Sequence, residues 1–286
     1  MADFFKKILF FILLISFAYA DSTDVETLQL SENTGPRWVG YSWLSIEYVI
    51  GPIVASSYWW KHAFGTNPFT NVCEQEHYIE DKMWHFWNGV NLSDFHNWVL
   101  RKYFGQNSPW PAMGMTFITL TAVEVLDASD AEAKWGLSVY DEIANLGGIA
   151  FWYVKYKYPE LPVDVRIGIR RWDVADRIIK RTHTYKLINP DYVDDIPKGR
   201  SSHADNYSIL KAELIVRPYD YFYIGFSASL KNDENGWGFS ENLLGITAGF
   251  DVMRWYAKKY PSKYSPYIDT FGRYFSQSIA YTHWLK

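Results

Sequence analysis

Three separate stretches of the chain each place two polar side chains three or four residues apart within an apolar run. The residues concerned are Asp81, Lys82, His85, Glu124, Asp127, Asp141 and Asn145. Side chains at this spacing share one face of an α-helix. One polar pair on the apolar face of each of three helices predicts a helical bundle with a polar cluster inside it.

Apolar periodicity and stop signals predict helices over residues 37–62, 82–104, 112–126 and 138–158. Gly89 or Asn91 is expected to interrupt the second helix, because the sequence from Asn91 to Asp94 is also typical of a new N-cap. Residues 127–135 are polar and predict a loop. Ser138 is the expected N-cap of the fourth helix.

The pattern changes after Pro162. Alternating and β-branched residues predict strands over 163–172, 207–216 and 219–230. Short helices are expected over 173–181 and 240–259, and a closing helix or strand over 268–285. The predicted fold class is mainly α, a helical bundle with a smaller antiparallel β-containing C-terminal region. The expected division is a signal peptide (1–20), a flexible N-terminus (21–36), a helical core (37–159) and a mixed β/α region (160–286).

The N-terminus has the pattern of a secretory signal. Lys6 and Lys7 precede an apolar run over 8–17, and the sequence from Ala18 to Ala20 is a small-x-small cleavage site. An uncleaved anchor is the alternative. The expected location is the periplasm or the outer membrane. The single cysteine, Cys73, excludes an intrachain disulfide and a thiolate-rich zinc site.

Composition favours a membrane or envelope lipid as partner. Aromatic residues make up 19% of the chain, with 14 Trp and 22 Tyr, and both concentrate at membrane–water boundaries. A soluble core with many exposed aromatics is the alternative. The net charge of −4 argues against nucleic acid as the main partner. Composition does not predict the oligomeric state.

Asp81, His85 and Glu124 are the candidate catalytic residues. A carboxylate four residues before an imidazole can orient it as a general base or a metal ligand. The alternative is an Asp favoured by the helix dipole and a His satisfied by packing. Glu124, inside an apolar helix, must reach a cation, a metal or water; pairing with Lys82 or an arginine is the simplest solution. Asp127, three residues on, is either solvated or part of the same group.

Lys82, Asp127, Asp141 and Asn145 complete the predicted cluster. Asp141 has a simpler explanation as the partner of Ser138 in a capping box. Asn145 shares its face with Gly147 and Gly148, which would let another helix approach closely. Metal binding is weakly indicated, because the Glu-x-x-His motif of carboxylate-bridged bundles is absent. His96 and His203 could add ligands, and no cofactor is predicted.

One internal echo relates residues 135–159 to 237–261. The two stretches share Trp-Gly-x-Ser at the start and Lys-Tyr-Pro at the end. Two helices with the same start and stop signals are the favoured explanation of the echo, and a true repeat is the alternative.

The pattern Asp81-Lys82-x-x-His85, Glu124-x-x-Asp127, and Trp135-Gly136-x-Ser138-x-x-Asp141-x-x-x-Asn145-x-x-Gly148 resembles the YfiM-like family of predicted periplasmic lipoproteins. Its opening also resembles the helix start of VanZ-like membrane proteins. The resemblance covers about residues 81–158 and implies an envelope protein with a helical core and a shared polar cluster. It implies no reaction. This chain departs from the family in having no lipid-anchor cysteine after its signal.

Two functions are consistent with these residues. The first is an exported, membrane-associated envelope protein of unknown activity, in which the cluster acts structurally or in binding. The second is a hydrolase or transferase acting on a lipid or cell-wall substrate, with metal as a potential aid. In the second, His85 is the general base, Asp81 orients it, and Glu124 and Asp127 are acids or metal ligands. The sequence does not decide whether the protein is an enzyme.

Overall fold

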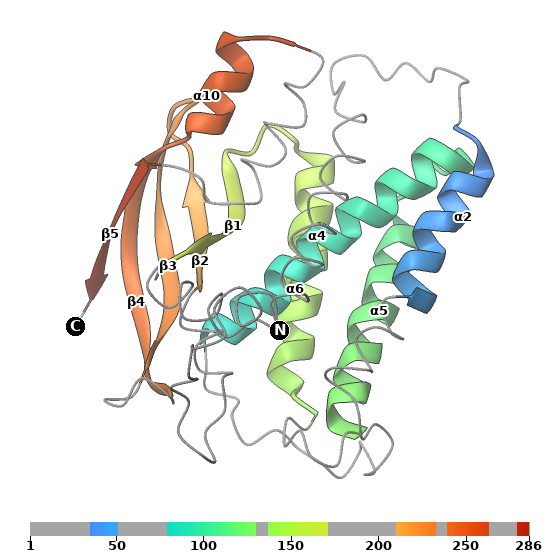
Figure 1. The fold of residues 1–286 in the computed structure, drawn as a ribbon, viewed down its shortest axis with the longest axis horizontal. Helices are drawn as coiled ribbons and strands as arrows, with labels where there is room; N and C mark the ends of the chain where they lie inside the picture. The colour runs from blue at the N-terminus through green and yellow to red at the C-terminus, as the bar shows by residue number, and fades with distance from the viewer. Residues whose placement is uncertain are drawn as a thin grey trace, which may run out of the picture. The chain divides into compact units, whose positions relative to one another are not determined.

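The computed structural model describes residues 35–50, 79–129, 137–170, 210–232, 239–262 and 279–285. The chain divides into two compact units, one spanning Asp24–Leu161 and the other Pro162–Lys286 with Met1–Thr23. The first contains helices and the second contains an antiparallel sheet (Figure 1). The expectation of a helical bundle with an antiparallel β-containing C-terminal region is confirmed in outline, but the chain is mixed α/β rather than plainly mainly α. The predicted signal peptide lies outside the described residues.

Within its described residues, the helical unit contains a short helix, a π-helical turn and three longer helices. The elements are α2 (Arg37–Ser45), the π-helix η1 (Ile46–Ile50), α4 (Ile79–Phe104), α5 (Trp110–Ser129) and α6 (Val139–Lys157). α4 packs against both α5 and α6, and it runs diagonally across α6 in Figure 1. Trp87, Phe95, Trp98 and Val99 are buried along α4, so this helix supplies much of the core of the unit.

α4 is continuous, so the expected interruption at Gly89 or Asn91 is wrong. The side chains that were expected to cap a new helix bond back to the preceding turn instead. Asn91 Nδ2 donates to the Trp87 carbonyl at 2.8 Å, and Ser93 Oγ donates to the Gly89 carbonyl at 2.7 Å. Such i−4 bonds are the alternative available to Asn and Ser within a helix.

Two glycines lie where α4 crosses α6. A Cβ on Gly148 would lie 2.1 Å from the Phe86 carbonyl oxygen, and a Cβ on Gly89 would lie 2.6 Å from the Asn145 carbonyl oxygen. The two glycine positions thus face each other with backbone against backbone. This confirms the expectation that the glycines after Asn145 admit a neighbouring helix, and it identifies Gly148 as the essential one.

The ends of α5 and α6 differ in how well they were predicted. α5 continues to Ser129, so the loop expected from residue 127 is wrong at its start, and Ser129 Oγ bonds to the Val125 carbonyl. The Ser138 N-cap is confirmed, because its Oγ accepts a hydrogen bond from the Asp141 amide at 3.1 Å.

α5 is long and apolar enough to cross a membrane, with a mean hydropathy of 1.2. The core helices of soluble proteins also pass this test.

The sheet is an antiparallel meander in which each strand pairs with the next along the chain. Its strands are β1 (Val163–Ile169), β2 (Leu210–Val216), β3 (Phe222–Asn232), β4 (Phe239–Phe250) and β5 (Ile279–Leu285). The first three confirm the strand predictions, and β5 shows that the described part of the C-terminal segment is a strand rather than a helix. The expected helix over 173–181 lies outside the described residues.

The helix expected over 240–259 is wrong for most of its length. β4 occupies the first part, and only α10 (Val252–Lys259) is helical. Gly245, Thr247 and Gly249 alternate with Leu244 and Ile246 in β4. This two-residue period, with glycines unfavourable to helix, favours a strand. The counterpart stretch over 139–157 is α6, so the echo is not a structural repeat.

Candidate polar site in the helical unit

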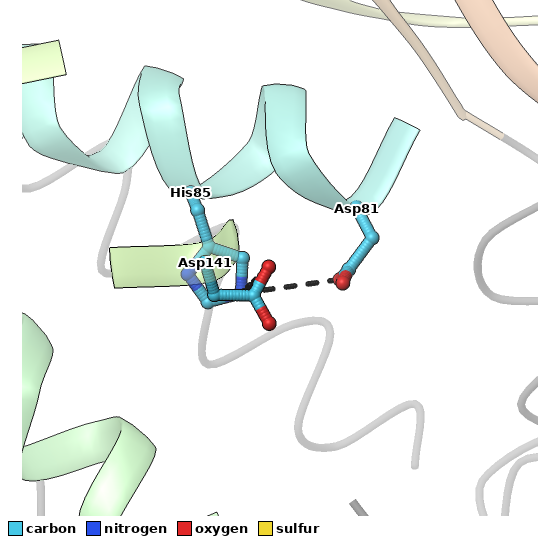
Figure 2. A group of neighbouring side chains, drawn as sticks. All are labelled: Asp81, His85 and Asp141. Atoms are coloured by element: carbon cyan, nitrogen blue, oxygen red, sulfur yellow. Dashed lines mark ion pairs between the residues drawn. The ribbon is translucent and has the colours of Figure 1, made fainter. Parts of the chain in front are cut away.

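The three helices bring the predicted polar residues to one place, the polar site, which comprises Asp81, Lys82, His85, Glu124, Asp141 and Asn145. Asp81, Lys82 and His85 lie in the first two turns of α4. Asp141 lies in the first turn of α6, and Asn145 lies one turn later. Figure 2 shows the Asp81 and His85 side chains projecting from the same helix towards Asp141.

Lys82 joins the two aspartates. Its Nζ lies 2.5 Å from Asp141 Oδ1 and 3.0 Å from Asp81 Oδ2, and it donates to Ser138 Oγ at 3.4 Å. The simple capping role considered for Asp141 is therefore incomplete. Its backbone amide takes part in the cap, while its carboxylate pairs with a lysine from another helix.

His85 lies between an amide and three carboxyl groups. Its Nδ1 is 3.2 Å from Asn145 Oδ1 and 3.4 Å from Glu124 Oε1. Its Nε2 is 3.7 Å from Asp141 Oδ1 and 3.9 Å from Asp81 Oδ1. A proton on Nδ1 is therefore directed at Asn145, while the Nε2 edge faces the two aspartates.

Glu124 is buried on α5, with a side chain only 3% exposed. Burial raises its pKa to about 9, and the negative charges of Asp141, Asp127, Glu142 and Asp81 add to the effect. Glu124 therefore carries its proton at neutral pH. It is not the partner of Lys82 that the sequence suggested, because the lysine pairs with the aspartates.

The pKa of Lys82 is also raised, although burial acts on an ammonium group in the opposite direction. Burial lowers the pKa of its ammonium, but Asp81 and Asp141 outweigh burial and leave the pKa above its usual value. The ammonium therefore stays charged through the neutral range. One fixed positive charge thus lies between two carboxylates at this position.

The polar site has an accessible rim and a buried floor. The side chains of Asp81, Lys82 and His85 are 23%, 17% and 17% exposed, whereas Asn145 is 0% exposed. Asn145 Nδ2 and Glu124 Oε1 are buried and make no hydrogen bond within the described part of the chain. A network that serves packing alone usually satisfies such atoms.

One donor atom from each of Asp81, His85 and Asp141 lies within 4.8 Å of the others. Two carboxylate oxygens and an imidazole nitrogen suit zinc, manganese or iron. Lys82 already contacts both carboxylates, so a metal ion and this ammonium would compete for the same oxygens.

The other predicted residues lie elsewhere or contribute less. Asp127 is half-buried one turn after Glu124 and acts on it through its charge. His96 is not part of the polar site. It is fully buried and bonds to Thr116 Oγ1 at 2.8 Å and to Glu47 Oε1 at 2.8 Å. His203 lies outside the described residues.

Sequence reasoning missed this second polar group around His96. Tyr48 Oη lies 3.1 Å from His96 Nε2, and burial, with the Glu47 charge, raises the pKa of Tyr48 to about 12. Glu47 and Tyr48 lie in the π-helix η1, and such irregular turns have no clear sequence pattern. The available signal was Glu47 itself, an acid in a run of apolar and aromatic residues.

Comparison with known proteins adds no relative. No protein-family model, no characterised protein and no solved structure matches the chain. The resemblance to the YfiM-like family therefore stays a prediction.

Proposed function

We propose that this chain is an exported, membrane-associated bacterial envelope protein whose helical unit binds a ligand at the polar site. The observation that carries the proposal is the combination of an accessible rim with two buried atoms, Asn145 Nδ2 and Glu124 Oε1, that make no hydrogen bond within the described part of the chain. A packing device would be dry and satisfied, whereas a binding site leaves polar atoms for its ligand. Export rests on the signal-like N-terminus.

The ligand class that the donor set favours is a divalent cation. Asp81, His85 and Asp141 supply two oxygens and one nitrogen within 4.8 Å, and the partly exposed rim offers an entry path. Lys82 is the internal competitor, because its Nζ is in contact with both carboxylates. Occupancy by metal would therefore require the lysine side chain to move aside.

This competition gives a direct test by calorimetric titration of the chelator-treated full-length protein with Zn²⁺ and Mn²⁺. Lys82→Met is expected to tighten metal binding about tenfold, because a competing charge is removed. Asp81→Asn and His85→Gln are expected to abolish binding. Lys157→Met is the matched control, since this exposed lysine lies at the opposite end of α6 from Asp141, and it should bind as the wild type does.

One result would contradict the proposed cation site. If neither the wild type nor Lys82→Met binds metal, and Lys82→Met only lowers the unfolding temperature, the cation site is wrong. The polar site is then an ion-pair network that holds α4 against α6, because removal of the lysine leaves the buried carboxylate of Asp141 and the partly buried carboxylate of Asp81 without their cation.

A second candidate is a hydrolase or transferase acting on a lipid or cell-wall substrate. It is favoured by the contrast within the site, where a protonated Glu124 lies 3.4 Å from an imidazole that two aspartates flank. Neighbouring groups held in different protonation states are typical of acid–base catalysis. In this function His85 accepts a proton and Glu124 donates one.

The enzyme candidate is tested with phospholipid and peptidoglycan fragments as substrates. His85→Gln should keep the unfolding temperature within a few degrees and lose turnover by about 100-fold or more. The Lys157→Met variant serves again as the control with full turnover. Turnover that survives His85→Gln, or that is absent in the wild type on every substrate, contradicts this candidate.

A further inference from the structure

The two faces of the sheet carry opposite kinds of side chain. One face, here called the apolar face, consists of three rows read from β1 to β5. The rows are Val163, Val216, Ile224, Ala248 and Tyr281; Val165, Leu214, Phe226, Ile246 and His283; and Ile167, Ala212, Ala228, Leu244 and Leu285. In these rows only His283 can carry a charge near neutral pH.

The other face, here called the polar face, contains the charged and small residues. Its rows are Asp164, Ile215, Gly225, Thr247 and Thr282, and then Arg166, Glu213, Ser227, Gly245 and Trp284. The charges of these rows lie on β1 and β2, and the serine, threonine and glycine residues lie on β3 to β5, with Ile215 and Trp284 as the apolar exceptions. The alternation along the strands therefore largely separates aliphatic side chains from polar ones.

Over much of the sheet burial is the reverse of what water favours. On the apolar face Phe226 is 67%, Ile224 55% and Ile246 50% exposed, while Val165, Ile167, Ala212 and Ala228 on the same face are buried. On the polar face Arg166 and Glu213 are fully buried. An antiparallel sheet in water buries its apolar face and exposes its polar one. Strands with apolar residues outward and polar residues inward are typical of a protein surrounded by hydrocarbon.

The buried charges on the polar face are paired with one another. Arg166 pairs with Asp251, and Arg217 bridges Asp164 and Asp251, with Arg217 Nη2 at 3.3 Å from Asp251 Oδ2. Pairing of this kind is needed where charges leave water. Several paired charges, rather than one residue, therefore make this face of the sheet polar.

One end of the sheet carries aromatic and lysine side chains. Phe250, the last residue of β4, has its ring 5.2 Å from that of Phe222 and 6.2 Å from that of Trp255. In α10, which follows β4 at this end (Figure 1), Lys259 Nζ lies 4.8 Å from the Trp255 ring. Aromatic residues with lysines are enriched where membrane hydrocarbon meets water.

We infer that the apolar face contacts the acyl chains of a lipid bilayer, with the aromatic and lysine end at headgroup level. A tilted strand needs about 9–11 residues to cross the hydrocarbon. β3 has 11 residues and β4 has 12, whereas β1, β2 and β5 have 7 each, so among the described strands only β3 and β4 are long enough to reach across. At that depth the outer edges of β1 and β5 must hydrogen-bond to further backbone of this chain or of a second copy. The aromatic composition indicated membrane contact but did not show which part of the chain makes it. The inference assigns this contact to the apolar face of the sheet.

The inference deepens the proposed membrane association, and it is independent of the polar site. The test uses the full-length chain with Cys73→Ser, which removes the single cysteine. Cysteines are introduced one at a time by Ile224→Cys, Phe226→Cys and Ile246→Cys on the apolar face, and by Ser227→Cys on the polar face as control. Each is labelled with a small fluorophore, the control after unfolding and refolding, and the protein is incorporated into phosphatidylethanolamine–phosphatidylglycerol vesicles.

Quenching then distinguishes the surroundings of each label. Labels at 224, 226 and 246 should lose most of their fluorescence in vesicles of brominated lipid and should resist aqueous iodide, while the label at 227 should resist the brominated lipid. Quenching of the three by iodide would overturn the inference, because the face would then lie in water. Resistance of the three to both quenchers would also overturn it, in favour of a protein partner or a second copy covering the face. Metal binding at the polar site does not affect either result.

Discussion

Gly148→Ala is expected to lower the free energy of unfolding of the helical unit by about 3 kcal/mol, the upper part of the usual range for overpacking. The added Cβ would lie 2.1 Å from the Phe86 carbonyl oxygen and 3.0 Å from Gly89 Cα. Both neighbours are backbone atoms, so no side chain can rotate away and α4 must separate from α6. This cost exceeds the gain of about 1 kcal/mol that alanine normally brings to a helix interior.

Two other glycines are the controls, each measured by chemical denaturation and followed by circular dichroism. Gly114→Ala in α5 meets nothing within 4 Å and should stabilise the unit by about 0.5–1 kcal/mol. Gly147→Ala meets only the Phe86 ring, at 3.2 Å, and should be close to neutral. If Gly148→Ala behaves as Gly114→Ala does, the close crossing of α4 and α6 is wrong.

The same crossing determines how far the polar site can be predicted from sequence. The i, i+3 and i, i+4 spacings show which polar side chains share a helix face, and the glycines after Asn145 indicate a close helix neighbour. These local signals suffice to group Asp81, His85, Glu124, Asp141 and Asn145. They do not show which charges pair, because the contact of Lys82 with Asp141 depends on how α4 and α6 cross.

The two errors have different causes. The local preference of Asn91 for a cap is overridden by tertiary packing, whereas the helix expected over 240–259 overlooks the two-residue period of β4, which itself favours a strand. Asn91 can bond to its own helix because packing keeps α4 continuous, and β4 forms because β3 and β5 are available on either side. Strand propensity depends strongly on such neighbours. The inverted sheet was missed because alternation alone does not tell which face is covered.

Glu124→Gln is expected to make the protein more stable than the wild type at alkaline pH and to flatten its pH dependence. In the folded state burial, with the nearby carboxylates, raises the pKa of Glu124 from 4.5 to about 9. The folded protein therefore binds one more proton than the unfolded chain between these values. The contribution of Glu124 to stability is fully present below pH 4.5 and is lost as pH rises towards 9.

The difference in free energy of unfolding between the wild type and Glu124→Gln isolates the contribution of Glu124 from those of all other titrating groups. Each pH unit within the window is worth at most about 1.4 kcal/mol for one proton, so the variant should gain roughly 2 kcal/mol on the wild type between pH 6 and pH 8. Urea denaturation of chelator-treated protein measures this gain, with the exposed Glu160→Gln as control, whose curve should parallel that of the wild type. A carbonyl band of a protonated carboxylic acid should also disappear from the infrared spectrum of Glu124→Gln at pH 7. Parallel curves for Glu124→Gln and wild type from pH 5 to 9, with no change in that band, would mean that Glu124 is ionised and that a cation reaches it.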